Sequence, residues 1–197
     1  MNDAASGTNL TFQGSFSGPE MRKAVVSCWS NVDGCTWMKS NFHILSNSSI
    51  SHLQQACNDV THRHVTLSLG FPSKLYSHVT QLQAKSHIVF ILRTLKNVMR
   101  LYEKSENADC DQQKLQTFIL DIHRQITELE RCATKIVITE TNKKIMKKME
   151  MHFKSLISHL KNADYSAKGW KDVAGLVLQH LYRLDLLAIN TKLDPSL

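Results

Sequence analysis

The chain has 197 residues, which is enough for one domain with a tail. Its 24 Lys and Arg residues outnumber its 17 Asp and Glu residues, giving a formal net charge of +7, and 42% of the residues are hydrophobic. It contains 7 Gly and 3 Pro, whereas an average chain of this length has roughly twenty-four of the two together. Between Cys35 and Lys168 the chain contains one Gly, Gly70, and one Pro, Pro72. This scarcity excludes many-turned β folds and α/β enzymes with Gly-rich loops, and predicts long helices.

The two ends of the chain differ from its middle. Residues 1–34 include a polar, Gly/Ser-rich stretch and are predicted to be a disordered tail, a tag or a leader remnant. Residues 35–190 are predicted to form the folded domain, and residues 191–197 a C-terminal tail. The chain has no run of eighteen apolar residues and no apolar leader at its N-terminus, so neither a membrane span nor a signal peptide is predicted.

Apolar residues recur at helical spacing in five segments of the middle region. The segments span residues 37–57, 82–102, 115–132, 139–160 and 166–187. A short turn from Phe71 to Tyr76 lies in the connection between the first two. The polar connector 105–111 offers N-cap residues for the third helix, Thr139 or Thr141 begins the fourth, and Ser166 caps the last.

The connections between these helices have unequal lengths. The first long helix reaches the second through about twenty residues, the second reaches the third through a short connector, and the third reaches the last through the additional basic helix. Two long crossovers around one short connection favour an all-α, up-up-down-down bundle with an extra short helix. A simple up-down-up-down bundle would need short loops throughout.

Five cysteines are interpreted through that topology. It places Cys35 at the same end of the bundle as Cys132, and Cys57 at the other end with Cys110. Two disulfides, Cys35–Cys132 and Cys57–Cys110, are therefore predicted, with Cys28 left over. The alternative is that some of these are buried, reduced cysteines acting as small hydrophobic residues.

No set of residues points to catalysis, a cofactor or a metal. The chain lacks a Gly-rich phosphate loop and a nucleophile elbow. His152 and His159 share a helix face but lie two turns, ~10 Å, apart, which is too far for one ion. We therefore predict a protein that is not an enzyme.

The fourth helix carries a cluster of lysines on its polar side. They are Lys143, Lys144, Lys147, Lys148 and Lys154. A solvated face opposite the apolar stripe is the simpler interpretation. The sharper one is a site for an acidic glycosaminoglycan or an acidic receptor patch. Nucleic acid is disfavoured because no aromatic residues interleave with the lysines.

Several short motifs resemble those of fish type I interferons. The segment Cys35-Thr-Trp-Met resembles the start of the mature family members, and Leu129-Glu-Arg-Cys132 resembles the segment with their second bridge half. Tyr165-Ser166 followed by Trp170, and then the final helix from His180 to Leu187, resemble the family's C-terminal signature. The four cysteines resemble the four-cysteine group. Lys168 stands where mammalian relatives have a bridged cysteine, and Ala174 where they have an arginine.

The resemblance implies a helical cytokine: a secreted, antiviral interferon, acting as a monomer, that joins two class II cytokine receptor chains of cytokine receptor family B and triggers JAK–STAT signalling. Carried onto this chain, the surface for the first receptor chain comprises Arg63, His64, Lys74, Lys171, Leu178, Gln179 and Arg183. Leu178 is expected to tilt outward as an apolar anchor. Charge and expected exposure nominate Arg93, Lys96, Arg100 and Arg124 for the second chain.

Two other interpretations stay open at the level of sequence. One is an interleukin-10-type class II cytokine, which shares the bundle. The other is an intracellular form or helical adaptor with reduced thiols. An extracellular protein would use the sequon Asn47-Ser-Ser49 on the polar side of the first helix for N-glycosylation.

Overall fold

The computed structural model describes residues 36–57, 70–103, 105, 108, 110–134 and 136–192. The helices are α2 (Thr36–Ser40), α3 (Phe42–Ala56), α4 (Ser73–Val79), α5 (Ala84–Tyr102), α6 (Gln112–Ala133), α7 (Glu140–Asn162) and α8 (Ala167–Lys192). No described residue lies in a β-strand, which confirms the predicted all-α class. None of the described helices is both long and apolar enough to span a bilayer.

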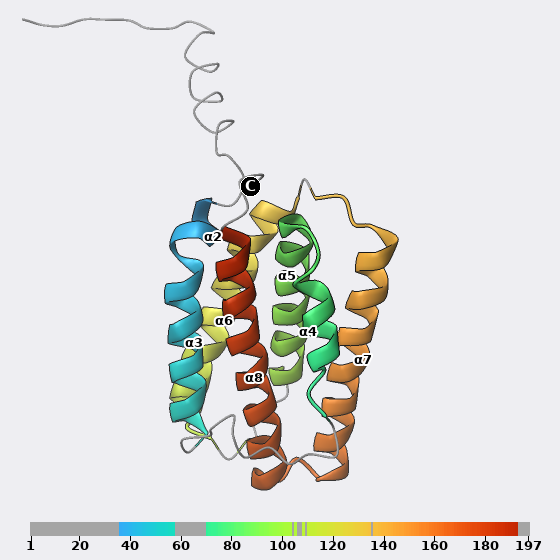
Figure 1. Cartoon of the computed structure of the whole chain (residues 1–197). Helices are drawn as coiled ribbons and strands as arrows, with labels where there is room; N and C mark the ends of the chain where they lie inside the picture. The colour runs from blue at the N-terminus through green and yellow to red at the C-terminus, as the bar shows by residue number, and fades with distance from the viewer. Residues whose placement is uncertain are drawn as a thin grey trace, which may run out of the picture. The chain divides into compact units, whose positions relative to one another are not determined.

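The helix directions confirm the crossover topology (Figure 1). α3 and α5 run in one direction, and α6 and α8 run in the other. Contacts agree with this: Ser49 of α3 accepts a hydrogen bond from Gln125 of α6, and His87 at the start of α5 meets Thr191 at the end of α8. Two helices, α4 and α7, lie in the crossover connections of this bundle. α4 has 7 residues, and the basic helix α7 has 23.

Side-chain caps fix where three helices begin. Asp111 accepts hydrogen bonds from the backbone N–H groups of Gln113 and Lys114 at 3.0 and 3.1 Å, and so starts α6. Thr139, rather than Thr141, caps α7 by accepting from Asn142 N at 3.2 Å. Ser166 Oγ accepts from Gly169 N at the start of α8. The predicted caps are thus confirmed, each satisfying a donor that the helix itself leaves unpaired.

The first predicted helix is divided in two. α2 ends at Ser40, and Asn41 forms a turn before α3. The backbone nevertheless stays nearly helical there, since Asn41 N donates to Trp37 O and Leu45 N donates to Asn41 O. The turn at Phe71–Tyr76 is likewise longer than predicted, extending to Val79 as α4.

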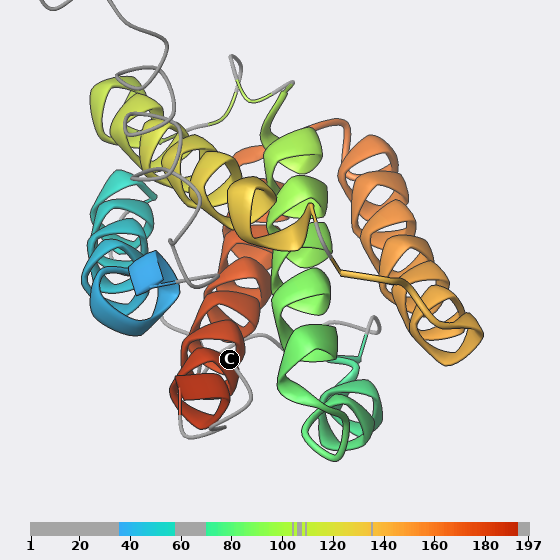
Figure 2. The same ribbon diagram turned by 90° about the horizontal axis from the view of Figure 1, so that it is seen from above.

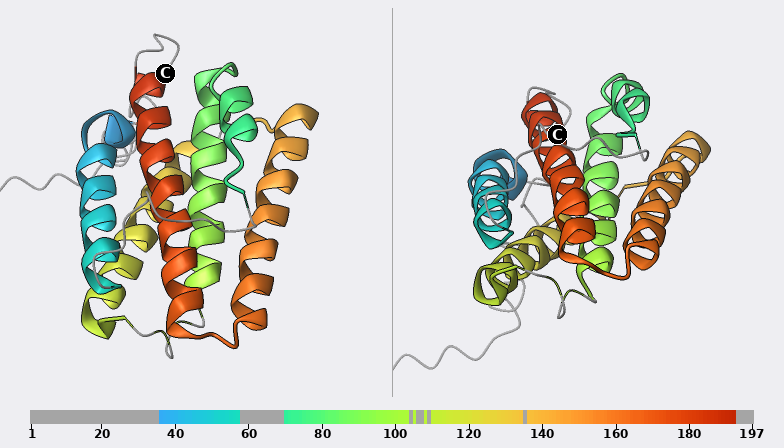
Figure 3. Two further views of the ribbon diagram at one scale, coloured as in Figure 1. Left: turned by 60° about the horizontal axis from the view of Figure 1, so that its bottom comes forward. Right: turned by 90° about the horizontal axis from the view of Figure 1, so that it is seen from below.

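α8 lies between α3 and α5 (Figures 2 and 3). It packs against α2, α3, α5 and α7. Apolar residues on nearly every side of its central part are therefore buried, including three in succession: Leu176, Val177 and Leu178. The predicted core stripe from Trp170 to Leu187 is confirmed, but the buried face is wider than that stripe.

A disulfide joins the C-terminal end of α3 to the connector between α5 and α6. Cys57 and Cys110 are bonded with their Cα atoms 4.4 Å apart, as predicted. Beside them, Asp111 N donates to Ala56 O at 2.7 Å. Cys132 is also disulfide-bonded, and its predicted partner, Cys35, lies outside the described residues.

Candidate functional site

A groove of about 320 Å³ lies between α4 and the C-terminal half of α8. It is lined by Ser73, Tyr76, Ser77, Thr80, Arg183, Leu186, Leu187, Ile189 and Asn190. Two of its apolar residues face water, because Leu186 is 53% exposed and Ile189 is 39% exposed. Exposed apolar side chains that adjoin an arginine are the combination that protein-binding surfaces favour.

Two histidine contacts hold the elements behind this groove. Buried His180 of α8 lies 2.8 Å from the Tyr76 hydroxyl through Nδ1 and 3.0 Å from His152 of α7 through Nε2. Burial, aided by the neighbouring His152, holds the pKa of His180 well below its usual value, and burial also lowers the pKa of His152. Both rings are therefore neutral at pH 7. This chain of contacts ties α4, α7 and α8 together and has a structural role.

The other flank of α8 is anchored to α3. His43 Nδ1 donates to the Asp185 carboxylate at 2.9 Å, and His43 Nε2 accepts from the side-chain amide of Asn47 at 3.0 Å. In this assignment Nδ1 carries the proton that faces Asp185, and Nε2 is the acceptor. Asp185 is buried, so this contact fixes the rotation of α8 relative to α3.

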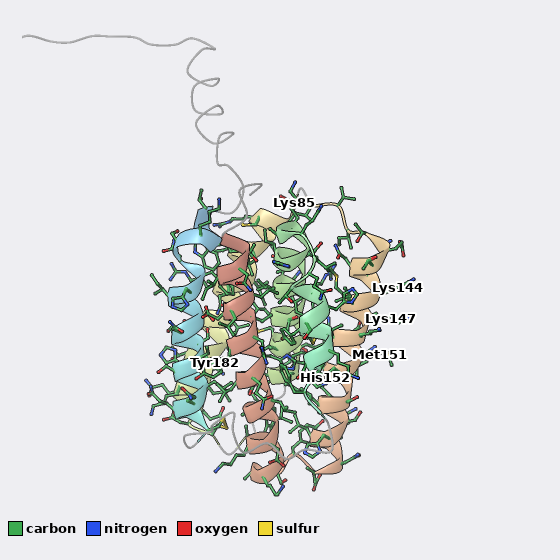
Figure 4. The ribbon with its side chains drawn as sticks, viewed as in Figure 1. Lys85, Lys144, Lys147, Met151, His152 and Tyr182 are labelled. Carbon is green, nitrogen blue, oxygen red and sulfur yellow. A yellow bond between two sulfur atoms is a disulfide. The ribbon has the colours of Figure 1, made fainter. Side chains whose placement is uncertain are left out.

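α7 is bordered by two further grooves, one on each side. The groove toward α5 has a volume of about 660 Å³, and its lining includes Arg93, Lys96, Arg100, Lys143, Lys147 and Lys154. The groove toward α4 has a volume of about 560 Å³, and its lining includes Lys74, His78, Lys144 and Lys148. In Figure 4, Lys144, Lys147 and Met151 lie along the outer side of α7, whereas His152 lies on the side toward α8.

Comparison with known proteins supplies the identity. The family model described as the interferon alpha/beta domain matches residues 36–189. The chain belongs to the interferon alpha/beta family. It is 26% identical to interferon a3 of Oncorhynchus mykiss over 156 residues, which cover 78% of this chain and 85% of that protein. Its fold is that of zebrafish interferon 1, with a TM-score of 0.71, 24% sequence identity, and coverage of 80% of this chain and 99% of the other.

Membership of the interferon family indicates how the protein acts. Interferons are secreted cytokines that bind cytokine receptors, and they are not enzymes. Within the residues that the structure describes, no group of three or more His, Cys, Asp or Glu side chains is placed to hold a metal ion. An interferon acts through its surfaces, so the grooves and exposed side chains are the relevant features.

The structure distributes the residues predicted for the first receptor chain over two places. Arg183 lines the α4–α8 groove, and Lys171 and Gln179 lie on α8, exposed and half-buried respectively. Lys74 is exposed but belongs to the groove between α4 and α7. Arg63 and His64 lie outside the described residues.

The expectation that Leu178 tilts outward is wrong. Its side chain is 0% exposed. The offset of one residue from Val177 would expose it on a helix packed on one side, but α8 is packed against four other helices. Leu178 is therefore a core residue of this interferon.

Sequence reasoning missed Leu186 and Ile189, the exposed apolar residues of the α4–α8 groove. The apolar run Leu186-Leu-Ala-Ile189 reads as a continuation of the core stripe. A signal was nevertheless present, because Gln179, Arg183 and Leu186 follow one another at steps of four and three. That spacing places Leu186 on the same face as two residues already predicted to be exposed.

The residues predicted for the second receptor chain are also divided. Arg93, Lys96 and Arg100 line the α5–α7 groove, and Lys96 pairs with Glu130 of α6. Arg124 is exposed on α6, outside that lining. The predicted lysine cluster of α7 does not form one patch: Lys143, Lys147 and Lys154 face the α5 groove, whereas Lys144 and Lys148 face the α4 groove.

Proposed function

We propose that this chain is a secreted, antiviral type I interferon that bridges two class II cytokine receptor chains and triggers JAK–STAT signalling. The observation that carries the proposal is the presence of two separate surfaces on different helices of an interferon bundle: the α4–α8 groove and the cationic side of α5 with Arg93, Lys96 and Arg100. A cytokine that brings two receptor chains together needs two separate surfaces, each with a few well-packed anchors.

The first receptor chain is assigned to the α4–α8 face. Its proposed contacts are Leu186 and Ile189 as apolar anchors, with Arg183 beside them and Lys171 and Gln179 further along α8. Arg183 is exposed on the rim of the groove, where a carboxylate of the partner can reach its guanidinium. The second chain is assigned to Arg93, Lys96, Arg100 and Arg124.

The cysteines support an extracellular protein of the four-cysteine group. The Cys57–Cys110 bridge and the bonded Cys132 fit an oxidising compartment and argue against an intracellular adaptor with reduced thiols. The interferon domain match favours this function over an interleukin-10-type cytokine. Asn47 is exposed, as N-glycosylation requires.

Binding to isolated receptor ectodomains tests the division into two surfaces. Each of the two receptor chains is immobilised, and wild type is compared with Arg183→Glu and with the double variant Arg100→Glu/Arg124→Glu. We expect Arg183→Glu to weaken binding to one chain and the double variant to weaken binding to the other, with signalling reduced in both. Lys85→Glu, an exposed change on α5 outside both surfaces, is the control. Loss of the same receptor chain in both variants would contradict the proposal.

A further inference from the structure

The groove between α5 and α7 has an unusually one-sided charge. Six cationic side chains line it: Arg93, Lys96, Arg100, Lys143, Lys147 and Lys154. The lining contains one carboxylate, Glu150. Two rows of cations facing each other across a groove produce a positive potential that is focused along its length.

Only part of this charge is engaged in ion pairs among the described residues. Lys143 pairs with Glu140, Lys154 with Glu150, and Lys96 with Glu130. Among the described residues, Arg93, Arg100 and Lys147 have no carboxylate within ion-pair distance. The pKa of the Glu150 carboxyl is lowered by its hydrogen bond and charge interaction with Lys154, and further by Arg100 and Lys147. Arg100 lies on the α5 wall and Lys147 on the α7 wall, so the positive charges of both walls act on the carboxylate between them.

The two rows are parallel and long enough for a linear ligand. α5 and α7 begin at the same end of the bundle, where Asn142 donates to Ser86 at 3.1 Å. From Lys143 to Lys154 the α7 row spans ~16 Å, and from Arg93 to Arg100 the α5 row spans ~10 Å, at 1.5 Å per helical residue. Several anionic groups spaced along a chain can therefore contact both rows at once.

The uncharged part of the lining indicates which polyanion fits. Among the described residues it consists of Asn97, Ile138, Met146 and Met151, none of which is aromatic. Single-stranded nucleic acids are held by stacking on aromatic rings, which this lining does not offer. A sulfated polysaccharide needs charge-assisted contacts to its sulfates and carboxylates, which Arg and Lys supply. It is also a polyanion of the extracellular space, where interferons act.

We propose that the α5–α7 groove binds a chain of sulfated glycosaminoglycan. This site differs from the predicted lysine cluster in two ways. It includes Arg93, Lys96 and Arg100 of α5 together with Lys143, Lys147 and Lys154 of α7. It does not include Lys144 and Lys148, which line the other groove. Arg93, Lys96 and Arg100 are shared with the surface proposed for the second receptor chain, so the glycosaminoglycan site is tested by an assay that contains no receptor.

Binding of heparin to the purified full-length chain tests this site. Affinity is measured by surface plasmon resonance or calorimetry in 150 mM NaCl, for wild type and for Arg100→Gln/Lys147→Gln. The control is Lys144→Gln/Lys148→Gln, which removes the same number of charges but from the α4 side of α7. We expect the groove variant to bind heparin at least about tenfold more weakly and the control less than about twofold, because only contacting cations release counterions. Circular dichroism checks that both variants remain helical.

Three results would overturn the proposal. The first is the absence of heparin binding by wild type in 150 mM NaCl. The second is an equal loss of affinity in the groove variant and the control, which would mean that net charge alone attracts heparin. The third is equally tight binding of a single-stranded RNA of matched charge, which would make the groove a nucleic-acid site. Because the assay contains no receptor, its result is independent of whether the proposed receptor surfaces are correct.

Discussion

Truncating the two apolar residues of the α4–α8 groove tests the first receptor surface most directly. Fully burying a Leu or Ile side chain stabilises by about 1.5–3 kcal/mol. Leu186 is 53% exposed and Ile189 is 39% exposed, so a receptor can still bury roughly half of each side chain. Allowing for the methyl group that alanine retains, Leu186→Ala/Ile189→Ala should weaken binding by about 1.5 kcal/mol, which is about tenfold in Kd.

The assay compares receptor affinity with stability in the same variants. Affinity for the first receptor ectodomain is measured by surface plasmon resonance, potency in an interferon-responsive reporter cell, and stability by urea unfolding. Leu120→Ala is the matched control, because Leu120 is 67% exposed on α6, away from this face. Leu178→Ala is the opposite control, since truncating a fully buried leucine should cost about 2–5 kcal/mol of stability.

The groove variant and the buried Leu178 variant should separate affinity from stability. The groove variant should lose affinity with its free energy of unfolding changed by less than about 0.5 kcal/mol, as is usual for exposed sites. Binding within twofold of wild type would refute the assignment of Leu186 and Ile189 as anchors. So would an equal loss of affinity in Leu120→Ala, because the effect would then not depend on the groove.

Three further predictions follow from other features of the structure. Cys57→Ser/Cys110→Ser opens a loop closed over a sequence separation of 53 and should lower the free energy of unfolding under oxidising conditions by about 4 kcal/mol; urea unfolding that matches wild type would contradict a stabilising bridge. Stability should fall as the pH drops below about 6.5, because burial lowers the pKa of His180 and His152 in the fold and the unfolded chain binds more protons there. Urea unfolding at pH 7.5 and 5.5 measures this, and the loss should shrink in His152→Gln, which removes one of the two titrating rings and leaves the Tyr76 hydroxyl in contact with His180. Secretion from eukaryotic cells should give a glycosylated product whose extra mass disappears on glycosidase treatment and in Asn47→Gln; an identical mass for wild type and Asn47→Gln would show that the sequon is unused.

The sequence was sufficient for the architecture because the relevant signals are local. Helical spacing of apolar residues placed the long helices, and Asp111, Thr139 and Ser166 marked their beginnings through short-range caps. Loop lengths then restricted the topology, and that topology places Cys57 at the same end of the bundle as Cys110, to which it is bonded. The helices and their caps needed only residues within one element, and the topology needed only the lengths of the connections.

The receptor surfaces were harder to predict because exposure depends on neighbours that are distant in the chain. Whether Leu178 faces water depends on how many helices surround α8, which its own sequence does not specify. The division of the α7 lysines is similar. Lys147 and Lys148 are adjacent in the chain, yet they line different grooves because α5 lies on one side of α7 and α4 on the other.

The packing of α8 against α2, α3, α5 and α7 explains why its two roles are separated along its length. From Val173 to Leu178 every residue is buried, so that part of the helix serves the core. Beyond Gln179 the burial becomes one-sided: Arg183, Leu186, Ile189 and Asn190 are exposed, while Leu184, Leu187 and Ala188 remain in the core. His180 and Asp185 lie within this second part, where their contacts with α4, α7 and α3 hold the helix in register. An exposed face held in this way is pre-organised, which lowers the entropic cost of binding a receptor. Substitutions at His43, which contacts Asp185 and does not line the α4–α8 groove, would therefore act on receptor affinity through the position of α8 without touching the receptor themselves.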